Sequence, residues 1–400
     1  MTIVNEKKVF PIGFTMPPPP DGKTPDGKGA FHELREAGGL FFRTGPQGKG
    51  TWNEAYLARE RQYMDAAADA GMFCLPWLKE LSVIEPGDTR KEEELQRIIN
   101  LFKDHPGLGI WKGEDEPEWG KASIPGLQNA YRIIKETDPN HPVWIVDAPR
   151  GSLDTLRVYD NNTRDITGVD IYPISYPPGT HSLLPNKEIS LVGDHAQIMM
   201  DVAEGKMPVW LTLQISWSGV VKPGRTLRMP TFAETRFMAY QSIITGARGL
   251  IFFGGHNVEA MTAEDRKVGW NWSHWNKVLR PVVEELGTNS RLQPALIAPD
   301  SKLEVRATRV GVEHAPLKGI ELLVREVGSE IYLLACMREG DAQQVRFHGL
   351  PAVDESAEVM FEEPRTAKVT TATDDKGKEQ HVLTDWFGPH EVHVYKLKKK

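Results

Sequence analysis

The sequence predicts a (β/α)8 barrel followed by a small all-β antiparallel sandwich domain, and three observations support this prediction. Short apolar runs alternate with amphipathic helical patterns, which is typical of βα units around a parallel sheet. The alternation gives eight strand and helix pairs over about 290 residues, which match a (β/α)8 barrel in number and length. From about residue 303 the helical period disappears, and short alternating strands replace it.

The eight expected barrel strands are short apolar runs bounded by turn residues. They fall at residues 9–15, 39–44, 71–77, 107–114, 142–147, 166–174, 208–216 and 248–255. A doubly wound open sheet is the competing fold, but it normally carries a glycine-rich phosphate loop after its first strand. Here the first strand runs into the proline-rich segment PIGFTMPPPPDGK, which favours the barrel.

Helical patterns follow the strands at residues 31–38, 53–71, 92–105, 124–138, 152–160, 189–205, 231–247 and 271–287. The clearest of them places apolar residues at positions i, i+3, i+4 and i+7, namely Leu95, Ile98, Ile99 and Phe102. Farther on, strands are expected at 303–310, 320–327, 330–337, 343–350, 356–362 and 391–397. We therefore expect a barrel domain over residues 1–300 and a sandwich domain over residues 301–400.

Composition excludes several classes of function. The net charge of −7, without a run of Lys and Arg interleaved with aromatics, argues against a nucleic-acid partner. No apolar stretch is long enough to span a bilayer, and the N-terminus has no hydrophobic signal segment. The expected compartment is therefore the cytoplasm, or the periplasm or exterior if a leader has been removed.

The numbers and positions of cysteine and tryptophan restrict the kinds of functional site that we expect. Cys74 and Cys336 each lie in an apolar run, which indicates buried free thiols rather than a disulfide. The chain has neither a CxxC nor an HExxH motif, so we expect no metal and no other cofactor. Eleven tryptophans, many near strand ends, suggest a surface that stacks on sugar rings, although any single one is better explained as core packing.

The stretch GIWKGEDEPEWG at 109–120 crowds carboxylates at the end of the fourth expected strand. Glu114, Asp115, Glu116 and Glu118 lie within five positions of one another. Active sites of such barrels lie at the C-terminal ends of the strands, and adjacent carboxylates in a partly desolvated pocket raise the pKa of one of them. This suits a general acid, whereas the alternative is a solvated acidic loop that caps the following helix.

The stretch HPGLGIWKGEDEPEWG, followed by NAYRIIKETDPNHPV, resembles the fourth strand of clan A glycoside hydrolases, where an Asn-Glu-Pro or Asp-Glu-Pro motif carries the acid/base glutamate. The resemblance extends to VDIYP, PTFAE and YQSIITGARGLIFF, and covers roughly residues 9–290. It implies that Glu116 donates a proton to the glycosidic oxygen. It also implies that Asp115 binds a sugar hydroxyl or orients the acid.

One position departs from that family. Its retaining members carry a nucleophilic glutamate at the end of strand seven, where PVWLTLQISWSG offers Gln214, and an amide cannot form the glycosyl ester. An inverting enzyme could use Asp170 or Glu234 as a second acid, with the carboxyl groups about 6.5–9.5 Å apart. Alternatively, an acetamido group of the substrate could act as nucleophile beside Asp115, or the barrel could bind carbohydrate without catalysis.

The two candidates for the second acid also have structural explanations. Asp170 could accept backbone hydrogen bonds at a strand end, and Glu234 follows Thr231 with the spacing of a capping box. Further sugar contacts are expected where the strands end, with aromatics stacking and polar groups binding hydroxyls. These substrate-binding candidates are Arg43, Trp77, Lys79, Glu114, Tyr172, Gln214, Trp217, His256 and Asn257.

The sequence thus predicts a glycoside hydrolase that acts on a plant- or microbe-derived glycoside or oligosaccharide, with Glu116 as general acid. The alternative from another class is a non-catalytic carbohydrate-binding barrel, motivated by Gln214. A different reaction on the same scaffold, such as elimination or transfer, is the third possibility.

Overall fold

The computed structural model describes residues 2–216, 228–312, 316–373, 377 and 379–400 of the chain. The chain forms two compact units. The first comprises Met1–Phe232 and Gly246–Ser290, and the second comprises Ala233–Thr245 and Arg291–Lys400. The sequence had suggested a single division between residues 300 and 301, so residues 233–245 and 291–300 are the segments that are grouped differently.

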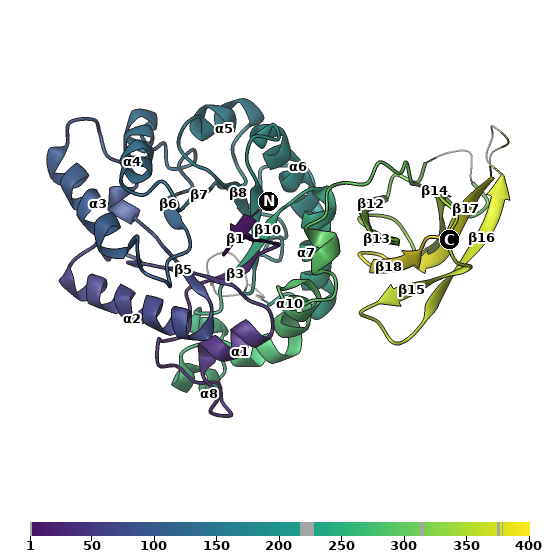
Figure 1. Cartoon of the computed structure of the whole chain (residues 1–400), viewed down its shortest axis with the longest axis horizontal. Coiled ribbons are helices and arrows are strands. Elements are labelled where there is room, and N and C mark those ends of the chain that lie inside the picture. The colour runs from purple at the N-terminus through teal and green to yellow at the C-terminus, as the bar shows by residue number, and fades with distance from the viewer. Residues whose placement is uncertain (1, 217–227, 313–315, 374–376, 378) are drawn as a thin grey trace. The chain divides into compact units, whose positions relative to one another are not determined.

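The first unit contains a ring of eight parallel strands (Figure 1). They are β3 (Ile12–Thr15), β4 (Phe41–Thr44), β5 (Phe73–Pro76), β6 (Trp111–Asp115), β7 (Val143–Val146), β8 (Thr167–Ile171), β9 (Val209–Gln214) and β10 (Gly249–Phe253). Six of them pair in the order β5-β4-β3-β10-β9-β8, and β6 pairs with β7. Parallel bridges such as Trp77 with Lys112 and Asp147 with Val169 join these two groups on both sides. The ring is therefore closed, and the predicted (β/α)8 barrel is confirmed.

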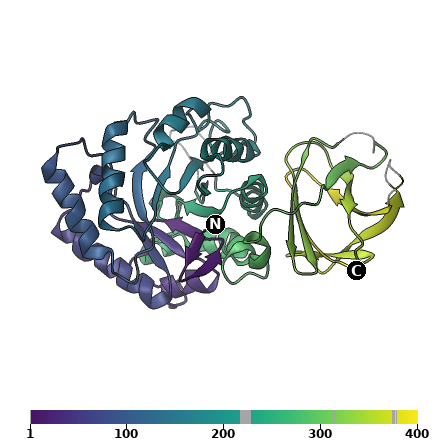
Figure 2. The same ribbon diagram turned by 45° about the horizontal axis from the view of Figure 1, so that its top comes forward.

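Helices lie outside the ring of strands, as Figures 1 and 2 show. In the first unit they are α1 (Ala30–Glu36), α2 (Glu54–Ala70), α3 (Thr89–Phe102), α4 (Ile124–Thr137), α5 (Leu153–Asp160), α6 (Leu191–Ala203), α8 (Ala263–Val268), α9 (Trp272–His274) and α10 (Arg280–Leu286). The apolar stripe predicted for α3 is fully buried. The single helix expected at 271–287 is divided instead by a π-helical turn over Trp275–Leu279. Among the described residues, no helix is both long and apolar enough to cross a membrane.

Aromatic side chains fill the N-terminal end of the barrel. The ring of Trp210 lies 5.6 Å from that of Phe41 and 6.2 Å from that of Trp144, and all three residues stand at the start of their strands. An antiparallel hairpin of β1 (Thr2–Val4) and β2 (Lys7–Val9), which the sequence did not reveal, packs Val4 and Val9 against this cluster. Because this end is closed, the C-terminal ends of the strands are left to form a site.

The second unit is an eight-stranded antiparallel sheet with strand order β11-β14-β17-β16-β15-β18-β13-β12. The strands are β11 (Arg306–Arg309), β12 (Ile320–Val327), β13 (Glu330–Met337), β14 (Gln343–Leu350), β15 (Ser356–Met360), β16 (Thr366–Thr373), β17 (Glu379–Phe387) and β18 (Val392–Lys398). Each of the eight contributes side chains to one shared core, which confirms the predicted all-β domain. Within this unit, α7 (Phe232–Thr245) is held by hydrogen bonds from Arg236 to the carbonyl of Val392 and from Gln241 to Glu321. The unit also contains α11 (Gln293–Leu296).

A buried ion cluster connects β7, α5 and the turn before β8. Arg164 is completely buried and pairs with the carboxylates of Asp147 and Asp160. Burial raises the pKa of Asp160 to about 6, and the nearby Arg164 guanidinium offsets only part of that effect. One cation thus serves two buried carboxyl groups.

This pKa predicts a pH dependence of stability. The folded protein protonates Asp160 near pH 6 and the unfolded chain near 3.8, so between these values the folded state binds more protons. The contribution of Asp160 to the free energy of unfolding therefore falls as pH rises from about 4 to about 6. An Asp160→Asn variant lacks this dependence and should gain stability relative to the wild type over that range. Urea denaturation of both proteins at several pH values measures the difference, and a constant difference would contradict the assignment.

Candidate functional site

Glu116 lies directly after β6 in an unusual backbone conformation. Its φ angle is +53°, a left-handed value that residues other than glycine rarely adopt. Its N–H donates a 2.8 Å hydrogen bond to the carbonyl of Val146 at the end of β7. Pro117 follows and prevents further strand pairing. Strained backbone of this kind is concentrated at functional sites, and here it fixes the direction of the carboxyl group.

The carboxyl groups of Glu116 and Asp170 lie close together, with one oxygen of each within 4.8 Å of the other. Asp170 belongs to β8 and is only 8% exposed. Two carboxyl groups this close repel each other when both are ionised, which favours a state in which one of them keeps its proton. The fourth and sixth strands of the barrel therefore meet in a proton-holding pair.

Electrostatics raises the pKa of both members of this pair. For Glu116 the largest cause is burial, followed by the negative charge of Asp115. Burial also has the largest effect on the pKa of Asp170, followed by the charges of Glu116 and Asp115. As a result, the pair retains a proton at pH values where an isolated carboxyl group would have lost it.

Asp115, in contrast to this pair, is ionised. Burial alone would raise its pKa, but the positive charges of Lys112 and Arg43 outweigh burial and lower this pKa. The Lys112 ammonium lies 3.1 Å from one carboxylate oxygen and the Arg43 guanidinium lies 3.6 Å from the other. The side chain is nevertheless 32% exposed. The site thus combines a protonated pair with a carboxylate that stays ionised and accessible.

Three stacked rings stand beside the carboxyl pair. His181 lies 4.8 Å from the ring of Tyr172 at an interplanar angle of 13°, and Tyr172 lies 5.4 Å from Phe253 at 24°. Burial, together with the positive charge of Arg150, lowers the pKa of His181 to about 4, so the imidazole is neutral near pH 7. Tyr172 was expected at the site from the sequence, whereas His181 was not.

Sequence reasoning also missed Arg150 and Trp119. The guanidinium of Arg150 lies 4.5 Å from the ring of Trp119, which is 52% exposed. Arg150 also acts electrostatically on Glu116 and His181. Both residues follow strand ends, in DAPRG and DEPEWG, so the rule that identified Glu116 could have found them. His181 lies well inside the long segment between β8 and α6, where no local signal marks it.

Glu116, Asp170 and His181 also form a group that could hold a metal ion. Their ligand atoms all lie within 4.8 Å of one another. The expectation of no metal had rested on the absence of two local motifs. This donor set is assembled from three separate segments, and two carboxylates with one imidazole are compatible with a divalent transition metal.

The remaining predicted residues divide into two groups. Arg43, Trp77 and His256 join the site. Arg43 lies 5.2 Å from the ring of Trp77, and its charge contributes, after burial, to lowering the pKa of His256 to about 4. The other three, Glu114, Lys79 and Asn257, form hydrogen bonds with neighbouring residues. Glu114 accepts a hydrogen bond from Ser82, and Asn257 donates one to Ser216. Lys79 donates to the carbonyls of Gly48 and Gly50.

Two predicted residues are not part of this group in the barrel unit. Trp217 lies outside the described residues. Glu234 lies in the first turn of α7, which belongs to the second compact unit. Neither is used in the proposal below.

Gln214, at the end of β9, is 1% exposed and its amide serves the backbone. Its carbonyl oxygen accepts a 2.7 Å hydrogen bond from the N–H of Ile174, and its NH2 group donates to the carbonyls of Ile174 and Ser216, both at 3.0 Å. The amide therefore holds the segment after β8 and is not available to a sugar, which corrects its assignment as a substrate contact.

These bonds predict the outcome of restoring the residue that retaining enzymes carry. Gln214→Glu would replace the NH2 donor with a carboxylate oxygen facing two carbonyl oxygens. We expect the free energy of unfolding at neutral pH to fall by about 2–6 kcal/mol, since each buried acceptor left unpaired costs about 1–3 kcal/mol. We also expect no gain in glycoside hydrolysis. Urea denaturation and an aryl-glycoside assay check both parts, and a stable variant with new activity would contradict this role.

The short distance between Glu116 and Asp170 argues against the proposed inverting pair. An inverting enzyme keeps its two carboxyl groups about 6.5–9.5 Å apart so that a water molecule fits between them and the sugar. Here one oxygen of each group lies within 4.8 Å of the other, which is closer than that spacing. Asp170 is therefore better placed to share the proton of Glu116 than to activate water.

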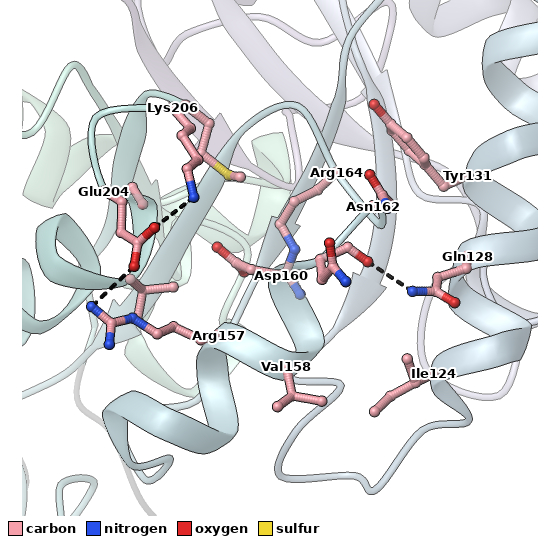
Figure 3. Close-up of a pocket in the computed structure, with 14 residues that line it drawn as sticks. Ile124, Gln128, Tyr131, Arg157, Val158, Asp160, Asn162, Arg164, Glu204 and Lys206 are labelled. Carbon is pink, nitrogen blue, oxygen red and sulfur yellow. Dashed lines mark hydrogen bonds and ion pairs between the residues drawn. The ribbon is translucent and has the colours of Figure 1, made fainter.

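A cavity of about 580 Å³ lies elsewhere on the barrel (Figure 3). It is lined by α4, by the second half of α5 and by the turns that lead into β8 and β9, and therefore lies toward the N-terminal ends of these strands. Its cations are paired, because Arg157 and Lys206 both contact Glu204, at 3.2 and 2.5 Å. This cavity contains none of the residues of the carboxyl site.

No protein-family model and no curated protein matches the chain, but solved structures share its fold. A glycoside hydrolase family 5 protein from Bacteroides vulgatus is 14% identical, with a TM-score of 0.61 over 99% of this chain and 90% of that one. A GH30 endoxylanase from Clostridium papyrosolvens is 11% identical, with a TM-score of 0.53 over 98% and 97%. An alpha-amylase from Geobacillus thermoleovorans is 11% identical, with a TM-score of 0.56 over 98% and 100%. At such identities the likeness is one of fold.

Proposed function

We propose that the protein is a glycoside hydrolase in which Glu116 donates the proton to the glycosidic oxygen. The observation that carries this proposal is the close pair of Glu116 and Asp170, whose pKa values are both raised, beside the ionised Asp115 at the C-terminal ends of the barrel strands. The fold is consistent with it, because the structural neighbours described above are glycoside hydrolases. Trp119, which is 52% exposed, offers a ring face for a sugar.

In the first step Glu116 transfers its proton to the glycosidic oxygen while the bond between the anomeric carbon and that oxygen breaks. The bonding electron pair leaves with the oxygen, which departs as an alcohol. The Glu116 carboxylate then takes a proton from the water that completes hydrolysis, so the acid is regenerated. Asp170 shares the proton of the pair before the reaction and keeps Glu116 from ionising early.

The nucleophile in this proposal comes from the substrate. The side-chain amide of Gln214 is engaged by the backbone, and Asp170 lies too close to Glu116 to act as a separate nucleophile. We propose that the oxygen of a 2-acetamido group attacks the anomeric carbon as the leaving group departs, which forms a cyclic oxazolinium ion. The ionised Asp115 stabilises the positive charge of this ion. Water then opens the ring, and the product keeps the configuration of the substrate.

A panel of aryl glycosides with and without a 2-acetamido group tests the proposal. We expect hydrolysis only of the acetamido sugars, with retained anomeric configuration in the first product seen by NMR. An inverted product would refute participation by the substrate. Sugar binding without turnover of any glycoside would refute the hydrolase and favour the carbohydrate-binding barrel.

A further inference from the structure

We infer that Glu116, Asp170 and His181 form a binding site for a divalent transition-metal ion, and that the bound ion inhibits the hydrolase by occupying the carboxylate of its proton donor. The binding half of this inference is independent of the enzymatic reaction. The inhibitory half rests on the function proposed above.

The three ligand atoms are close enough to share one ion. They lie within 4.8 Å of one another, whereas ligand atoms at about 2.0–2.2 Å from a single zinc ion are separated by roughly 3–4 Å. Small side-chain rotations would therefore bring all three atoms within bonding distance of one ion. Three protein ligands would leave a further coordination position for water.

Two buried atoms at this point have no hydrogen-bond partner among the described residues. They are Oδ1 of Asp170, whose side chain is 8% exposed, and Nδ1 of His181. Buried polar atoms of folded proteins almost always have a hydrogen-bond partner, so two unpartnered atoms in one cluster indicate a site for a ligand. A cation that accepts lone pairs from both a carboxylate and an imidazole would satisfy them together.

The backbone holds the three donors in place before any ion arrives. Asp170 belongs to the barrel strand β8, and the N–H of Glu116 is tied to the carbonyl of Val146. The imidazole of His181 is oriented by its stacking on Tyr172. Rigid donors lose little conformational entropy on binding, which favours affinity.

The donor set selects the class of ion. One imidazole nitrogen with two carboxylate oxygens suits Zn²⁺ or Mn²⁺, whereas Ca²⁺ and Mg²⁺ prefer shells made of oxygen. Cys74 and Cys336 are the only thiols of the chain, and both are buried, so they do not offer a competing soft site.

Titration calorimetry of the full-length protein without a histidine tag, with ZnCl2 as the probe, tests the site. We expect one ion per chain for the wild type and at least a roughly 10-fold weaker association constant for His181→Gln. His256→Gln is the matched control, because His256 is a second half-buried imidazole with an unpartnered Nδ1 but lies outside the triad. It should bind Zn²⁺ like the wild type. MgCl2 should bind at least 10-fold more weakly than ZnCl2.

Equal affinity in the wild type and His181→Gln would overturn the site, and so would the absence of stoichiometric binding. Circular dichroism confirms folding, and Asp170→Asn is judged by the same criterion if His181→Gln does not fold. Zn²⁺ should also stop glycoside hydrolysis over the concentration range in which it binds, and EDTA should restore it. If Zn²⁺ binds and turnover is undiminished, the inhibition is refuted. If Zn²⁺ binds to a protein that cleaves no glycoside, the proposed hydrolase function is refuted but the metal site is not.

Discussion

Replacement of Glu116 by glutamine (Glu116→Gln) is expected to lower kcat for glycosides with poor leaving groups by roughly 10²- to 10⁴-fold. The amide has nearly the same shape as the acid but cannot transfer a proton to the glycosidic oxygen. The loss should be smaller for aryl glycosides whose phenol leaves easily, because these substrates need less protonation. Steady-state kinetics over a series of phenols of different acidity measures this dependence.

The matched control is Glu118→Gln, which makes the same chemical change two residues farther along the acidic loop. Glu118 lies outside the triad and outside the ion pairs of Asp115. We therefore expect its kcat to stay within a few-fold of the wild-type value. Equal losses in the two variants would indicate that the loop needs its charge, and unchanged turnover in Glu116→Gln would remove Glu116 from the mechanism.

Arg164→Leu is expected to lower the free energy of unfolding by about 3–5 kcal/mol, because it leaves the buried carboxylates of Asp147 and Asp160 without their cation. Urea denaturation at neutral pH measures the loss. Adding Asp147→Asn to this variant should recover part of the stability, because one uncompensated charge is then removed.

Arg157→Leu provides the comparison. Arg157 lies on α5 and lines the same cavity as Arg164, but its side chain is 40% exposed and its partner Glu204 is exposed to a similar degree (Figure 3). Exposed ion pairs contribute about 0–1 kcal/mol, so this variant should lose little. Similar losses for the two arginines would show that burial does not determine the effect.

Most of the fold could be predicted from the sequence because the barrel strands are buried and flanked by turn residues. All eight were recognisable as apolar runs, and the stripe of α3 was visible from its spacing. Strands β16 and β17 were not predicted because polar Thr, Lys and Asp residues interrupt their apolar residues. The hairpin of β1 and β2 is too short and too charged to stand out, and its burial depends on a cluster that exists only in the closed barrel.

The candidate site was predictable only in part. Glu116 and Asp170 could be proposed because each ends a strand, but their proximity requires strands four and six to flank β7 in the closed barrel. The role of Gln214 depends on the backbone of Ile174, forty positions away in the chain. His181 comes from a long connecting segment whose course local residue patterns do not determine.

The aromatic cluster of Phe41, Trp144 and Trp210 closes one end of the barrel, so access is from the C-terminal ends of the strands only. In the proposed hydrolase, cleavage products would therefore have to leave by the same route by which the substrate enters. A product that dissociates slowly would compete directly with the next substrate molecule.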